Sequence, residues 1–72
     1  MSLYSEMEAV LKHFECASTA GDHSMACDAA RSVLERKSPE AMTPQERRLA
    51  MELCYEIGDY ALMETLRKLD NH

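Results

Sequence analysis

The sequence lacks tryptophan and is poor in other aromatic residues, with one phenylalanine and three tyrosines among 72 residues. Such a composition indicates a core built from leucine, methionine and alanine, which are good helix formers. The chain also shows no segment with the alternating pattern of a strand. We therefore expect an all-α protein.

Long apolar runs and an excess of positive charge are missing as well. No run approaches the roughly 18 apolar residues of a membrane-spanning helix, and the N-terminus lacks the basic and apolar regions of a signal peptide. We expect a cytoplasmic protein that does not enter a membrane. Acidic residues outnumber basic ones by 13 to 8, which gives a net charge of −5. This charge disfavours nucleic acid and favours a protein or peptide partner with a basic surface.

Cysteine is scarce and cannot be fully paired. The three cysteines, Cys16, Cys27 and Cys54, are odd in number and form no CxxC motif. We expect them to be reduced. Without disulfides, a single domain of this length gains only about 3–5 kcal/mol from its core. Oligomerisation or partner binding would add to that stability.

A repeated glycine-aspartate pair is the most informative feature that the sequence does contain. Gly21-Asp22 and Gly58-Asp59 lie 37 positions apart, each at the end of a helical pattern. Glycine accepts the left-handed backbone that ends a helix, and the following aspartate can cap the next helix. Each pair therefore predicts the turn of a helical hairpin.

The remaining signals divide the single domain, residues 1–72, into two hairpins. We expect helices at about 3–20 and 24–37, a linker over residues 38–43 interrupted by Pro39, and a second hairpin over residues 44–70. The second hairpin has helices at about 44–57 and 60–69. Its start is marked by Thr43-Pro44-Gln45-Glu46, a capping box with proline at the first helical position. Either Ser2 or Ser5 could cap the first helix.

Apolar residues at helical spacing predict the core. On the third helix they form an arc that also includes Ala50 and Cys54. The predicted core consists of Leu3, Met7, Val10, Phe14, Ala26, Ala30, Val33, Leu49, Leu53, Ile57, Leu62 and Leu66.

The two turns are similar to the Gly-Asp-Tyr-x-x-Ala turn of tetratricopeptide repeats. The segments concerned are Gly21-Asp22-His23-Ser24-Met25-Ala26 and Gly58-Asp59-Tyr60-Ala61-Leu62-Met63. Their spacing of 37 residues exceeds the 34 of that family. The resemblance implies stacked helical hairpins with a concave surface that binds a peptide or a helix. It implies no enzymatic activity.

Some apolar residues cannot join this core. Met51 and Tyr55 lie opposite Leu49 and Leu53 on the third helix. Methionine adapts its shape to a partner and tyrosine is enriched at interfaces, so we predict a partner-binding patch. Its members are Met51, Tyr55, Tyr60 and Met63. The competing interpretation is that they are ordinary exposed side chains.

Two chemical alternatives involve histidine and cysteine. His13, Cys16, His23 and Cys27 have spacings that put each pair on one helix face, as in a zinc site. However, Cys16 projects opposite the apolar stripe of its helix. Cys27, near the expected start of the second helix and four residues after His23, resembles an activated nucleophile, but no oxyanion or substrate motif accompanies it. We expect no metal, no cofactor and no catalysis.

These observations predict four helices in two antiparallel hairpins, arranged as in tetratricopeptide repeats or as a small bundle. The predicted function is non-catalytic protein binding, as an adaptor, small chaperone or inhibitor. The alternative is a homodimeric helical bundle in which Met51 and Tyr55 are buried against a second copy.

Overall fold

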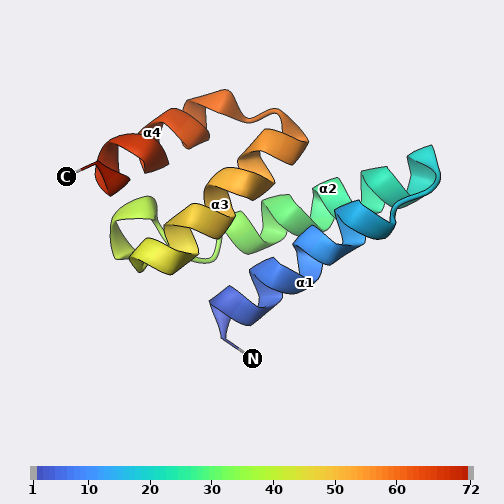
Figure 1. Ribbon diagram of the computed structural model, residues 1–72, viewed down its shortest axis with the longest axis horizontal. Coiled ribbons are helices and arrows are strands. Elements are labelled where there is room, and N and C mark those ends of the chain that lie inside the picture. Colours follow the sequence, from blue (N-terminus) through green and yellow to red (C-terminus); the bar gives the residue numbers. More distant parts are fainter. Residues whose placement is uncertain (1, 72) are drawn as a thin grey trace.

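The computed structural model describes residues 2–71, and within this range the chain is entirely helical, with no strand (Figure 1). The all-α prediction is confirmed. The elements are α1 (Leu3–Cys16), α2 (Ala20–Leu34), the short 3-10 helix η1 (Pro39–Ala41), α3 (Pro44–Ile57) and α4 (Tyr60–Asp70). Among the described residues, no helix has the length and apolar character needed to cross a membrane.

The first hairpin turns earlier than the sequence pattern predicts. Helix α1 ends at Cys16, and the side chain of Thr19 caps α2 by accepting a hydrogen bond from the Asp22 N–H at 3.0 Å. Gly21 therefore lies inside the first turn of α2, and its φ is not positive. The predicted left-handed Gly21 and capping Asp22 are wrong. A threonine cap three residues before an acidic residue is the stronger start signal here.

The second hairpin follows its sequence signals closely. Thr43 and Glu46 form a complete capping box at the start of α3, with Pro44 at the first helical position. Gly58 ends α3 in left-handed geometry, with φ of 76°. Asp59 then caps α4 by accepting from the Leu62 N–H at 3.2 Å. The predicted roles of Gly58 and Asp59 are confirmed.

The segment between the hairpins contributes to the core. Its η1 turn packs against α4 and is followed by Met42, which is buried. The Arg47 guanidinium donates to the Met42 carbonyl at 2.6 Å, which holds the backbone at this point. At the start of α1, the capping residue is Ser2 rather than Ser5.

The helices form a flat arrangement of about 38 × 26 × 17 Å rather than a closed bundle. Helix α1 packs against both α2 and α3, while α4 packs against α3 and η1. Figure 1 shows α3 between the first hairpin and α4. With so few layers, every helix keeps an exposed face.

The core is centred on α3, which packs against α1, α2 and α4. The largest fully buried side chains are Met7, Leu53, Leu66 and Cys54. Seven predicted core residues are buried, namely Met7, Val10, Ala26, Ala30, Val33, Leu53 and Leu66. The other five are only partly buried, namely Leu3, Phe14, Leu49, Ile57 and Leu62. Buried apolar residues outside the predicted core are Leu34, Met42, Ala50 and Cys54.

Candidate functional site

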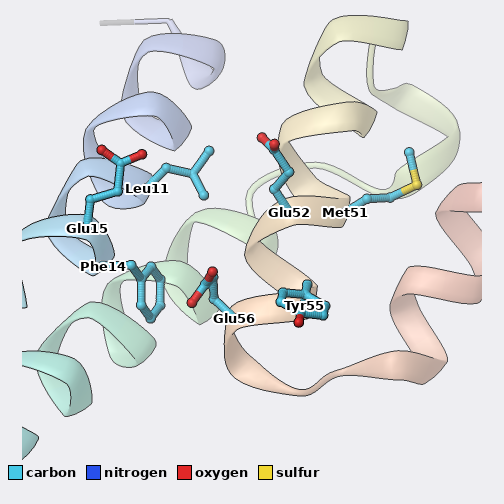
Figure 2. A pocket seen from close by; sticks show the side chains of 7 residues that line it. All are labelled: Leu11, Phe14, Glu15, Met51, Glu52, Tyr55 and Glu56. Carbon is cyan, nitrogen blue, oxygen red and sulfur yellow. The ribbon is translucent and has the colours of Figure 1, made fainter.

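A groove runs between α1 and α3. One hollow of this groove has a volume of about 460 Å³ and is lined by Leu11, Phe14, Glu15, Met51, Glu52, Tyr55 and Glu56. In Figure 2, Leu11 points toward α3, while Glu52 and Glu56 project toward α1. Met51 points away from α1, and Tyr55 lies one turn further along α3. The lining of the groove therefore combines apolar side chains with carboxylates, and two of these carboxylates lie on the side of α3 that faces α1.

The groove continues toward the N-terminal halves of the same helices. A second hollow is lined by Tyr4 of α1 and by Gln45, Arg48, Leu49, Met51 and Glu52 of α3. The two hollows share Met51 and Glu52, so they form one continuous seam. N-terminal residues of both helices meet at one end of this seam and C-terminal residues at the other, so α1 and α3 run in the same direction (Figure 1).

The four predicted patch residues fall into two pairs. Met51 and Tyr55 line the groove, whereas Tyr60 and Met63 do not. Tyr55 is 67% exposed and Tyr60 is 64% exposed. Met51 and Met63 are partly buried and pack against the core. The expectation that Met51 cannot join the core is therefore wrong. The structure thus separates α4 residues from the surface that Met51 and Tyr55 share.

Leu11 and Phe14 complete the groove, and the sequence did not identify them as site residues. Both belong to the apolar stripe of α1, and both are only partly buried. The Phe14 ring meets the His23 ring edge to face, with centroids 5.4 Å apart. The one sequence signal for them was the width of the apolar stripe on α1, which is more than one neighbouring helix can cover. In the structure, α1 contacts both α2 and α3.

Three glutamates line the groove, namely Glu15, Glu52 and Glu56. Their negative charges lie at positions that do not favour helix stability. Glu15 and Glu56 are each the last residue but one of their helices, where the helix dipole favours positive charge. Glu52 and Glu56 are four residues apart on α3, a spacing at which like charges repel. None of these three carboxylates forms a salt bridge with another residue of the range 2–71. Helix formation alone does not account for their placement.

Two other acidic side chains, Glu6 and Glu46, have basic partners. Glu6 pairs with Arg36 and so links α1 to the segment that follows α2. Glu46 is 6% exposed and accepts hydrogen bonds from the Thr43 N–H at 2.8 Å and from the Lys37 ammonium at 3.1 Å. The backbone hydrogen bond from Thr43, assisted by Lys37, lowers the pKa of Glu46 despite the opposing effect of burial. Glu46 therefore stabilises the start of α3.

The histidine and cysteine residues give a weaker candidate site. The Cys27 sulfur lies 3.7 Å from Nδ1 of His23. Because α2 begins at Ala20, Cys27 lies beyond its second turn, where the helix dipole has little effect on a thiol. The expected position near the helix start is thus wrong. Within the described part of the chain, no three His, Cys, Asp or Glu side chains gather in a metal-binding group.

Cys54 is the one buried thiol among the described residues. Burial raises its pKa to about 11, and the Asp59 carboxylate adds to the shift. A thiol with so high a pKa stays protonated near neutral pH and is a poor nucleophile. Cys54 therefore acts as a packing residue of α3.

The apolar groove between α1 and α3 is consequently the best-formed candidate site. No family model matches this chain, and none of the curated proteins or solved structures compared with it is similar enough to count as a relative.

Proposed function

We propose that this protein is a non-catalytic binding module that takes an apolar segment of another protein or peptide into the α1–α3 groove. One observation carries the proposal: apolar side chains from two helices, Leu11 and Phe14 on one side and Met51 and Tyr55 on the other, line an open hollow of about 460 Å³. Exposed apolar concavities of this kind are common at protein-binding sites. The role is that of an adaptor, small chaperone or inhibitor.

Three free thiols and an acidic surface are compatible with a cytoplasmic setting, where thiols stay reduced. The arrangement of two hairpins with α1 beside α3 is also compatible with the suggested likeness to tetratricopeptide repeats. In such an arrangement the groove would belong to the concave face.

Two tyrosines provide a matched test. Tyr55 lines the groove and Tyr60 does not, although their side chains are almost equally exposed. Helical peptides would be selected by display on the full-length protein, and their affinity measured by fluorescence anisotropy. We expect Tyr55→Ala to weaken binding by about 1–2 kcal/mol, as at an interface hot spot. Tyr60→Ala should leave the affinity unchanged.

The proposal is wrong if Tyr60→Ala weakens binding as much as Tyr55→Ala, or if neither variant does. Helicity measured by circular dichroism should remain the same in both variants. Light scattering over a range of concentrations would detect the alternative, in which a second copy of the chain covers the groove.

A further inference from the structure

The groove has a chemical polarity along its length. Glu15 and Glu56 lie at its C-terminal end, Glu52 lies where the two hollows meet, and Arg48 lies at the N-terminal end. The three glutamates form no salt bridge with any other described residue. An occupant that places positive charge at the C-terminal end would supply the missing counter-charges.

The shape of the groove favours a helix as the occupant. Two helices that run side by side in the same direction leave a furrow that accepts the side-chain ridge of a third helix. Residues 2–71 contain no strand, so an extended peptide would find no sheet edge there to extend. The seam reaches from Tyr4 to Glu15 on α1. The eleven helical steps from Tyr4 to Glu15 span about 16 Å, which matches about three turns of a bound helix.

We propose that the groove binds a basic amphipathic helix of about three turns from another protein. This inference rests on the proposed function and adds the chemistry of the partner. The apolar face of the bound helix packs on Leu11, Phe14 and Tyr55. Lysine or arginine side chains of the bound helix, next to this apolar face, pair with Glu15, Glu52 and Glu56.

Charge also argues against a second copy of this chain as the occupant. Each copy carries a net charge of −5. Placing groove against groove would bring the three glutamates of one copy close to the three glutamates of the other. The one basic residue of the described range that lines the groove is Arg48, so each set of three carboxylates would meet at most one counter-charge. Like charges across an interface disfavour association.

Three synthetic peptides test the proposal on the full-length protein. They share one apolar stripe at helical spacing, and their polar positions carry lysine, glutamine or glutamate. Fluorescence anisotropy should show that the lysine peptide binds about tenfold more tightly than the glutamine peptide, because three exposed ion pairs each contribute modestly. The glutamate peptide should bind weakest. Added salt should reduce the preference for lysine.

Matched charge variants then locate the effect. The triple variant Glu15→Gln/Glu52→Gln/Glu56→Gln should abolish the preference for the lysine peptide. The control Glu35→Gln/Glu40→Gln/Glu64→Gln removes the same charge from residues outside the groove and should retain it. Peptide helicity, followed by circular dichroism, should rise on binding.

Each other outcome contradicts a different part of the account. If the glutamine and lysine peptides bind equally and both depend on Tyr55, the groove binds proteins but the charge inference is wrong. If the control variant loses the preference as fully as the groove variant, only net charge matters. If no peptide binds, both proposals fail. If sedimentation shows a dimer that Tyr55→Ala dissociates, a second copy occupies the groove.

Discussion

At the scale of single residues, the two glycines show how the same dipeptide acquires different roles. Gly58 adopts a φ of 76° and ends α3, whereas Gly21 has no positive φ and lies in the first turn of α2. The Gly-Asp pair alone does not distinguish these cases. The preceding residues determine whether the glycine ends a helix or lies inside one. Thr19, two residues before Gly21, caps α2 and so places Gly21 inside the helix.

Alanine substitution should therefore affect the two glycines in opposite directions. Gly58→Ala forces a side chain into left-handed geometry and should lower the free energy of unfolding by about 1 kcal/mol. A Cβ at Gly21 would lie 3.8 Å from Oγ1 of Thr19, an ordinary contact. Gly21→Ala should thus stabilise the protein by about 0.4–1 kcal/mol. Chemical denaturation measures both values, and equal destabilisation would contradict the assigned turn.

Glu46 makes stability depend on pH. Because the pKa of Glu46 is lower in the folded protein than its usual value of 4.5, its ionised form stabilises the fold above that value. This contribution is lost as the pH falls through the folded-state pKa. In Glu46→Gln the amide oxygen can still accept from the Thr43 N–H. We expect its stability to fall less steeply than that of the wild type below about pH 4.5. Parallel slopes in acid denaturation would contradict this role.

The cysteines should differ in their reactivity with a thiol reagent. Cys16 is exposed and Cys27 is partly exposed, whereas Cys54 is buried and its pKa is raised to about 11. Mass spectrometry after labelling at neutral pH should show modification of Cys16 and Cys27 in the folded protein. Cys54 should react only after unfolding. Rapid labelling of Cys54 under native conditions would show that α3 is not packed as described.

At the scale of the elements, sequence reasoning was most accurate where caps and periodicity agree. The start of α3 and the turn between α3 and α4 carry explicit capping signals, and both were predicted correctly. The boundary between α1 and α2 was missed because apolar spacing continues past Cys16 although the helix does not. Met42 was missed because it lies outside any periodic helix and is carried into the core by η1.

The core prediction can be tested by comparing Leu53 with Phe14. Leu53 is fully buried, whereas Phe14 is partly buried and lines the groove. Leu53→Ala should cost about 2–5 kcal/mol, comparable with the whole stability of so small a domain. Phe14→Ala should cost less than the 3–5 kcal/mol typical of a fully buried ring. Thermal melts that rank the two variants in the reverse order would place the core elsewhere.

At the scale of the whole molecule, the groove depends on how two distant helices are set side by side. Periodicity identified the outward position of Tyr55 on α3, whereas Met51 packs partly against the core. It did not show that Leu11 and Phe14 face them, because α1 and α3 belong to different hairpins and their contact is tertiary. Tyr60 and Met63 were grouped with the patch by residue type, and the turn at Gly58 carries them away from the groove.

An NMR titration of the full-length, isotope-labelled protein with the lysine-bearing amphipathic peptide tests the central claim most directly. The account predicts the largest chemical-shift changes at Leu11, Phe14, Glu52 and Tyr55, with small changes over Ala20–Leu34 and Tyr60–Asp70. Shift changes centred on α2 or α4, or no change on saturation with peptide, would contradict it.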